Sequence, residues 1–157
     1  MFNLEQLTFG GTAATVTSMG LIVGLDATTI SQGTVVGSLL IVALADNLTD
    51  SLSVHMYQES ERLPEREALQ TTITNFFVRL VVSLSFIGIY LLAPTGLRVL
   101  LSVGWGFCVL AALSYGIARR RSVSGFSEIW KHTLVAVAVI GVSKAIGAWI
   151  VVMTAPG

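Results

Sequence analysis

Hydrophobic positions divide the chain into five long apolar runs, separated by short polar segments. An α-helix rises 1.5 Å per residue, so about 20 apolar residues cross the roughly 30 Å hydrocarbon core of a bilayer. Pro94 and Gly96 separate the third run from the fourth, and the polar segment DATTISQ separates the first from the second. The pattern predicts an all-α integral membrane protein with five transmembrane helices in one domain, residues 1–157. The expected spans are residues 9–25, 33–57, 72–92, 97–117 and 130–153.

The composition supports a membrane protein and excludes several other classes. Hydrophobic residues make up 54% of the chain and charged residues 11%, whereas a soluble domain has about 25% charged residues. The runs are continuously apolar rather than alternating, which excludes a β-barrel. The net charge of zero argues against a nucleic-acid partner. Cys108 is the single cysteine, so the sequence offers no intrachain disulfide.

Basic residues are distributed unevenly between the two ends of the expected spans. Arg98 lies near one end, whereas the segments after the second and fourth runs are rich in arginine and lysine. By the positive-inside rule, this asymmetry predicts a cytoplasmic N-terminus and a C-terminus outside. We expect the plasma (inner) membrane of a prokaryote. The basic residues of the predicted inner side are Arg62, Arg66, Arg119, Arg120, Arg121 and Lys131.

The second run carries acidic residues where they are costly. Asp46 and Asp50 lie in its second half, and a carboxylate at the centre of a bilayer costs roughly 2.5–3.5 kcal/mol even on lenient insertion scales. Their spacing of four residues places both on one helix face. Further polar residues continue from this face to the end of the run, which is the arrangement that a cation path needs. The predicted metal ligands are Asp46, Asp50, Asn47, Glu59, Glu61 and His55.

Two basic residues in the expected spans would balance these acids. Arg79 lies in the third run, close enough to its predicted cytoplasmic end to snorkel, and Lys144 lies near the middle of the fifth. In one interpretation, ion pairs lock the second, third and fifth spans together. In the other, the carboxylates bind a cation, and Lys144 occupies the site or acts as a proton-linked switch. Arg79 and Lys144 are therefore the predicted charge-compensating residues.

The types of the candidate ligands indicate which ion they would take. Carboxylate, amide and hydroxyl oxygens suit Mg²⁺, Mn²⁺ or Ca²⁺, and an imidazole adds affinity for Fe²⁺ and Zn²⁺. Oxygen ligands from Asp46, Asp50 and Asn47, doubled across a dimer seam, would form a hard, anionic site for Mn²⁺ or Fe²⁺. The absence of a second cysteine and of a histidine cluster argues against Cu⁺ and against a closed structural Zn²⁺ site. The metal is expected as a transported substrate, and no permanently bound cofactor is predicted. No sequence motif of a hydrolase or a phosphate-binding loop is present, so we do not expect an enzyme.

The first run is rich in small and hydroxyl residues instead of large aliphatic ones. Its segment GGTAATVTS at residues 10–18 is followed by Gly20 and Gly24. Small residues let helices approach closely, and threonine or serine can hydrogen-bond across the contact. Such a helix is typical of the centre of a bundle or of a dimer seam. We predict a homodimer formed through the first span.

Taken together, these motifs resemble the vacuolar iron transporter family, including its yeast-type and nodulin-like members. The strongest part is ADNLTDSLSVHMYQESE at residues 45–61, which is similar to the family's second-span pattern of A-N/D-x-x-x-D-A-L-S with a glutamate-bearing end. Residues 10–25 resemble its first span, and VSKAIG at residues 142–147 the end of its fifth. The resemblance implies a homodimeric, proton-coupled carrier of Fe²⁺ or Mn²⁺ whose path is lined by the first two spans.

The chain also departs from the family pattern. Gly10-Gly11 stands where the family has Asp-Gly, Val54 stands near its mid-path methionine, and Lys144 stands at its tyrosine-like position. The cytoplasmic metal-binding helices between the second and third spans are reduced to about residues 57–70. The expected function is divalent metal transport. The alternative is a non-transporting assembly or interaction protein of the same fold, with its acids neutralised by Lys144 and Arg79.

Overall fold

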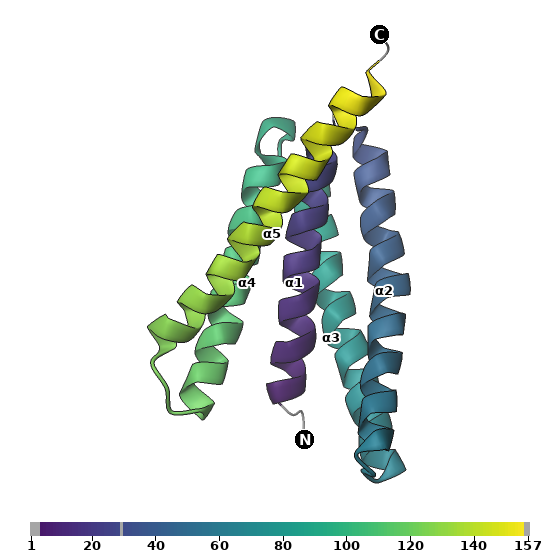
Figure 1. The fold of residues 1–157 in the computed structure, drawn as a ribbon, viewed down its shortest axis with the longest axis vertical. Coiled ribbons are helices and arrows are strands. Elements are labelled where there is room, and N and C mark those ends of the chain that lie inside the picture. The colour runs from purple at the N-terminus through teal and green to yellow at the C-terminus, as the bar shows by residue number, and fades with distance from the viewer. Residues whose placement is uncertain (1–3, 29, 156–157) are drawn as a thin grey trace.

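The computed structural model describes residues 4–28 and 30–155, and this part of the chain forms five long helices (Figure 1). Each helix is long and apolar enough to cross a membrane, which confirms the predicted all-helical membrane protein with five spans. A short 3₁₀ helix, η1 (Thr95–Leu97), follows the third. The helices are α1 (Leu4–Asp26), α2 (Gln32–Ser60), α3 (Glu65–Leu92), α4 (Arg98–Arg120) and α5 (Gly125–Thr154).

The connection between α2 and α3 is much shorter than the sequence pattern indicated. The α2 helix ends at Ser60, Arg62 adopts a left-handed φ of 58°, and α3 begins at Glu65 directly after Pro64. Proline precedes a helix readily because its φ is fixed near the helical value, and Glu65 favours the positive end of the helix dipole. The expected start of the third helix at residue 72 was therefore too late by about two turns. The two helices form a closely connected hairpin.

The other helices also extend beyond the apolar runs that predicted them. The α5 helix begins at Gly125 instead of residue 130, and α4 ends at Arg120 instead of residue 117. Charged residues such as arginine and glutamate are good helix formers, so a helix continues past the point where its hydrophobicity ends. At the start of α2, the hydroxyl of Ser31 accepts a hydrogen bond from the backbone N–H of Thr34 at 3.2 Å. This cap satisfies one of the free N–H groups of the first turn.

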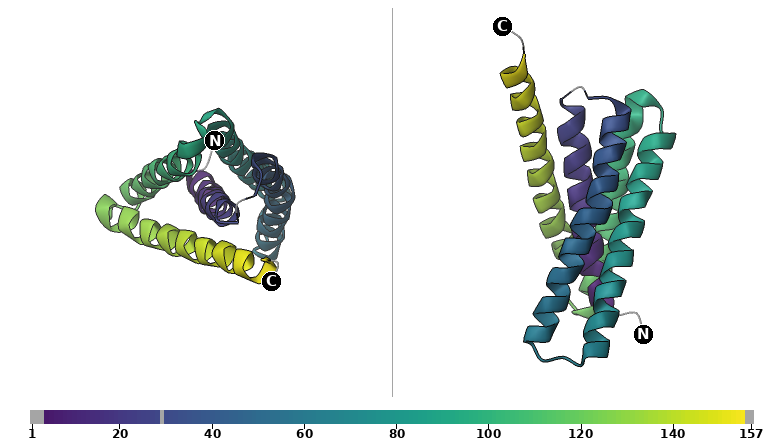
Figure 2. Two further views of the ribbon diagram at one scale, coloured as in Figure 1. Left: turned by 90° about the horizontal axis from the view of Figure 1, so that it is seen from above. Right: turned by 90° about the vertical axis from the view of Figure 1, so that its right-hand side faces the viewer.

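The α1 helix lies at the centre of the bundle, as the view from above shows (Figure 2). It packs against all four other helices, and its Thr15 and Ser18 are buried. At its end, Gly24 meets Gly147 of α5 so closely that a Cβ on Gly147 would collide with the Gly24 carbonyl oxygen. The small residues of the first run were compatible with the centre of a bundle or with a dimer seam. The structure places α1 at the centre of the bundle.

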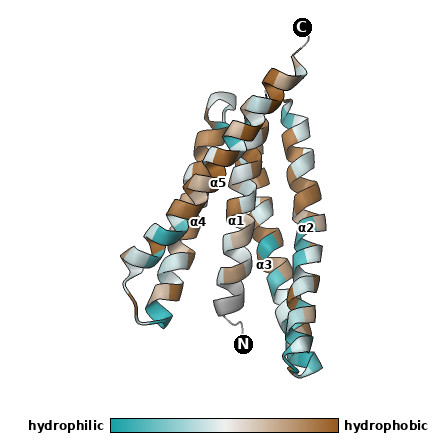
Figure 3. Cartoon of the chain, viewed as in Figure 1, coloured by the Kyte–Doolittle hydropathy of each residue, from teal (hydrophilic) through white to brown (hydrophobic). Residues whose placement is uncertain are grey.

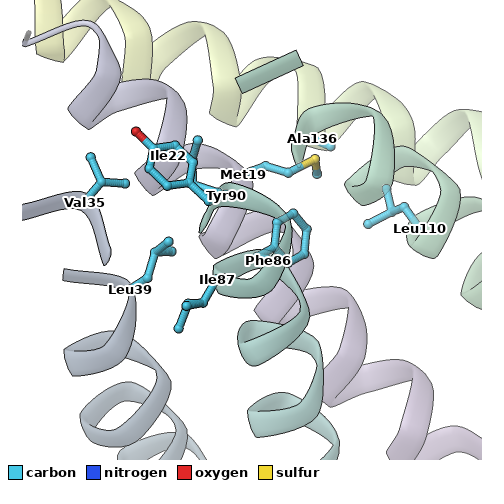
Figure 4. Close-up of a cluster of buried hydrophobic side chains, with 9 residues drawn as sticks. All are labelled: Met19, Ile22, Val35, Leu39, Phe86, Ile87, Tyr90, Leu110 and Ala136. Carbon is cyan, nitrogen blue, oxygen red and sulfur yellow. The ribbon is translucent and has the colours of Figure 1, made fainter. Parts of the chain in front are cut away.

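The apolar core surrounds the second half of α1 (Figure 4). Met19 and Ile22 of α1 are fully buried against side chains from all the other helices. The hydroxyl of Thr15 donates to the carbonyl of Gly11 at 2.7 Å, so this buried polar group is satisfied within its own helix. The core residues are Met19, Ile22, Val35, Leu39, Phe86, Ile87, Tyr90, Leu110 and Ala136.

Hydrophilic residues gather at one end of the bundle (Figure 3). The α2–α3 and α4–α5 connections lie at this end with the start of α1, and the end of α5 lies at the opposite one. Between the ends, the outward faces of the helices carry many exposed large apolar side chains. In lipid such residues meet acyl chains instead of water. The predicted cytoplasmic position of the hydrophilic end stays a prediction.

Candidate functional site: a buried arginine between two carboxylates

Arg79 of α3 is buried and points its guanidinium at α2. Its Nη2 donates to Oδ2 of Asp46 at 2.6 Å, and its Nε donates to Oδ1 of Asn47 at 2.9 Å. Its Nη1 lies 2.9 Å from Oδ2 of Asp50, as an ion pair outside good hydrogen-bond alignment. One guanidinium therefore engages three polar side chains on one face of α2. We call Asp46, Asn47, Asp50 and Arg79 the arginine cluster.

A polar seam on α3 leads to this cluster. Thr71, Asn75, Arg79 and Ser83 recur every fourth residue and are all buried, so they form one stripe along the helix. The Asn75 Nδ2 atom donates to Asp50 Oδ2 and to Ser51 Oγ, each at 3.3 Å. The sequence reasoning missed Asn75 and Ser51 as members of the site. The signal was present in the four-residue spacing of polar residues within the third apolar run.

The α1 helix closes one side of the seam because Gly10 has no side chain. A Cβ at Gly10 would collide with the amide oxygen of Asn75 and would lie 3.1 Å from Cγ of Arg79. Any larger residue would push α1 away from α3 at this level. Gly10 therefore allows α1 to pack directly against Asn75 and Arg79 and to cover the buried side of the arginine cluster.

The cluster carries one more negative charge than positive. Two carboxylates face one guanidinium, and arginine stays protonated in proteins. The Arg79 side chain is 3% exposed, whereas those of Asp46 and Asp50 are 48% and 31% exposed. Both acids contact Arg79 through their Oδ2 atoms. The cluster thus has a sealed cationic side and a partly open anionic side on α2.

A cavity of about 420 Å³ adjoins Asp50. A different cavity, of about 530 Å³, lies between α1, α4 and α5, away from the arginine cluster. The cavity beside Asp50 lies between the start of α1, the second half of α2 and the first half of α3, and Gln58 and Asn75 contribute to its lining. The Gln58 Oε1 and the Asn75 Oδ1 are buried and accept no hydrogen bond in the described part of the chain. Amide oxygens without partners next to a carboxylate are groups that a hard cation can use.

His55 and Glu59 do not join the arginine cluster. The His55 Nδ1 lies 3.2 Å from Oγ1 of Thr72, and its Nε2 lies 3.5 Å from Oε1 of Glu59. His55 lines another cavity, whose lining does not include Asp50. The hydrogen bond to Thr72 orients the imidazole towards α3. His55 and Glu59 therefore form a separate pair at the hydrophilic end of α2.

Two further predicted ligands are placed in positions that do not suit that role. Asn47 is buried, with its Oδ1 taken by Arg79 and its Nδ2 donating to the carbonyl of Ala43 at 2.6 Å. Glu61 follows the end of α2 and is exposed in the turn. Within the described residues, no three histidine, cysteine, aspartate or glutamate side chains come together. Three of the six predicted ligands, Asp46, Asn47 and Asp50, thus meet at Arg79, and the other three lie apart from them.

The two predicted charge-compensating residues behave differently. The expected ion pair between an acid and a base is present through Arg79, which lies 14 residues after the start of α3 at Glu65, about 21 Å along the helix. It therefore does not snorkel to the end. Lys144 is exposed on α5, and α5 packs against α1 and α4 but not against α2 or α3. Of the two bases expected to pair with Asp46 or Asp50, Arg79 makes the pair, and Lys144 makes no ion pair within the described part of the chain.

Comparisons of the chain with protein-family models, with curated proteins and with solved structures gave no match. The resemblance to the vacuolar iron transporter family therefore stays a prediction from the residues of the first, second and fifth spans.

Proposed function

We propose that this protein is a membrane carrier for a divalent cation, Fe²⁺ or Mn²⁺, with Asp46 and Asp50 as its intramembrane ligands. The observation that carries the proposal is the excess carboxylate of the arginine cluster, in the middle of the α2 span and partly open. An uncompensated negative charge at this depth is costly unless a cation accompanies it. A carrier gains from such a site because it is most stable when an ion is bound.

The neighbourhood of Asp50 supports the same proposal. The cavity of about 420 Å³ beside it has room for a partly hydrated ion, and the amide oxygen of Gln58, which has no hydrogen-bond partner among the described residues, is free to contribute. Oxygen donors from carboxylate and amide groups favour Mn²⁺ or Fe²⁺ over soft ions. Glu59 and His55, further along α2, would then meet the ion at the hydrophilic end of the path.

Loading a metal changes the role of Arg79. Each carboxylate contacts the guanidinium through Oδ2, so the ion binds on the open side of the carboxylates or displaces Arg79 from one of them. Protons compete with the metal because carboxylates must be ionised to bind it. Uptake would therefore weaken as the pH falls into the range in which carboxylates are protonated.

A second candidate function rests on the buried guanidinium itself. Arg79 already contacts both acids and Asn47. In this alternative, the network has a purely structural role and holds α2 and α3 together. The protein would then be a non-transporting membrane protein with an assembly or interaction role. The two functions differ in one measurable property, which is whether ions cross a membrane that contains the protein.

Uptake of Mn²⁺ and Fe²⁺ by proteoliposomes tests the proposal. The wild type should transport, and Asp50→Asn should abolish transport while the protein still folds, because asparagine keeps the shape and can accept a bond from Arg79. The matched control is Lys144→Met, which removes an intramembrane charge that lies away from the cluster. Full uptake by Asp50→Asn, or none by the wild type at any pH, would support the assembly role instead.

Assembly and orientation form part of the proposal. We propose a homodimer in which the open face of α2, with Asp46, Thr49 and Ser53 exposed, is covered by a second copy. The α1 helix, which is seen between α5 and α2 in Figure 1 and on which Thr17 is exposed, would join that seam. We also propose that the hydrophilic end faces the cytoplasm of a prokaryote, because arginine and lysine gather there. Cross-linking of cysteines placed at position 49 or 53 tests the seam.

A further inference from the structure

A groove lies between α1, α4 and α5, away from the arginine cluster. It encloses about 530 Å³, and its walls are mostly apolar, with Phe9, Ala13 and Val16 from α1. It runs along α1 from Thr8 to Val16, about 12 Å at the helical rise. Phe9 is 60% exposed and Val135, on the α5 wall, is 56% exposed. The groove is therefore open towards the lipid side of the bundle.

One end of this groove is cationic. Arg120 and Arg121, at the end of α4, line it together with His132 of α5. Neither arginine lies within 4 Å of a carboxylate in the described part of the chain, where the ion pairs are those of His55, Arg79 and Lys131. The nearby Glu128 is engaged by Lys131, whose Nζ lies 2.9 Å from Oε1 of Glu128. Two guanidinium groups are thus available for an anion.

His132 is held in a fixed position at the same end. Its Nδ1 lies 2.7 Å from Oγ of Ser114, which is buried on α4. When the hydroxyl donates to Nδ1, the neutral imidazole carries its hydrogen on Nε2 and can donate it to a third group. Ser114 thereby fixes the ring, and in this tautomer the Nε2–H group is left to donate to a ligand at the mouth of the groove.

We propose that this groove binds one anionic glycerophospholipid. Its phosphate would lie between Arg120, Arg121 and His132, and an acyl chain would lie along the apolar wall of α1. Charge complementarity selects this occupant, because basic pockets between transmembrane helices bind anionic headgroups and an apolar groove in lipid takes a chain. The volume of the groove lies within the usual range for small-molecule sites. The proposal does not depend on metal transport.

Native mass spectrometry of the full chain in detergent, titrated with phosphatidylglycerol or phosphatidylcholine, tests the headgroup contact. The wild type should bind one phosphatidylglycerol more tightly than phosphatidylcholine. The double variant Arg120→Gln/Arg121→Gln should lose about tenfold or more of its affinity for phosphatidylglycerol. The control Arg66→Gln/Arg119→Gln removes the same charge from exposed residues that do not line the groove and that leave the Lys131–Glu128 ion pair intact, and should keep the preference. Equal affinity of the wild type for both lipids would overturn the proposal, as would equal losses in the two double variants.

A second pair of variants tests the acyl-chain contact without changing any charge. Gly116 lines the groove, and a Cβ there meets no atom within 4 Å, so Gly116→Leu fills the groove without a clash at the backbone. Gly104 lies on the same helix with equally open space but does not line the groove. Gly116→Leu should weaken binding of both lipids, and Gly104→Leu should not. Unchanged lipid binding by Gly116→Leu would overturn the proposal, and circular dichroism of each variant checks that it has folded.

Discussion

Arg79 and Lys144 are both basic residues within membrane-spanning helices, yet the structure treats them in opposite ways. Arg79 is buried between α2 and α3 with three partners, whereas Lys144 is exposed on α5, away from the acids. The α2–α3 seam is thus a polar network around one buried guanidinium, whereas Lys144 lies on an exposed face of α5 that also carries exposed apolar side chains such as Val142 and Ile146. The position of a charge within the bundle, not its presence in a span, decides whether it stabilises the fold.

The largest expected effect distinguishes the two basic residues directly. Arg79→Met leaves Asp46 and Asp50 without their cation, and breaking a buried ion pair in this way costs about 3–5 kcal/mol. Lys144 is exposed and forms no ion pair in the described part of the chain. Lys144→Met should therefore cause no loss of stability. Unfolding in detergent by added sodium dodecyl sulfate measures both. Equal losses in the two variants would show that the seam and the α5 face are equivalent.

Coupling within the seam sharpens the same comparison. If Arg79 and Asp50 stabilise each other, Arg79→Met/Asp50→Asn should lose less than the sum of the two single variants, by about 1 kcal/mol or more. Replacing Lys144 in place of Arg79 should give additive changes with Asp50→Asn. The free energies of unfolding of the single and double variants form the required cycle. Additivity in the Arg79 cycle would contradict the ion pair at 2.9 Å.

The close approach of α1 gives an effect of intermediate size. Gly10→Leu places a side chain against Asn75 and Arg79 and should cost about 1–3 kcal/mol by overpacking. Gly141→Leu is the control on α5, because a Cβ at Gly141 meets no atom within 4 Å. It should leave stability unchanged. Tolerance of leucine at position 10 would mean that α1 does not seal the seam.

The smallest effect concerns a single hydroxyl on α2. Ser51 accepts a hydrogen bond from Asn75 at 3.3 Å and is buried, so Ser51→Ala should cost about 0.5–1.5 kcal/mol. Ser53 is exposed and donates to the carbonyl of Thr49 in its own helix, so Ser53→Ala should cost less. A precise unfolding titration of both alanine variants tests this difference. A larger loss at position 53 would place the important polar contacts on the open face of α2.

Much of the fold could be predicted from the sequence. Runs of about 20 apolar residues determine five spans, because every backbone polar group in hydrocarbon must be satisfied within its own helix. The small residues of the first span likewise indicated close packing, which α1 has at the bundle centre. Helix ends were less predictable, because Glu65 and Arg120 favour helix without being apolar.

The candidate site was only partly predictable, for a physical reason. Asp46 and Asp50 stood out alone because a carboxylate in a span needs an explanation whatever surrounds it. Which base pairs with them depends on which helices are in contact. The sequence has one candidate base on α3 and one on α5, and their spacing along the chain does not show which of them reaches the carboxylates. Tertiary packing decided it: the tight turn after Ser60 brings α3 against α2, and Gly10 lets α1 close over Arg79. Packing also placed α5 against α1 and α4 and out of contact with α2, so that Lys144 lies beyond the reach of either carboxylate.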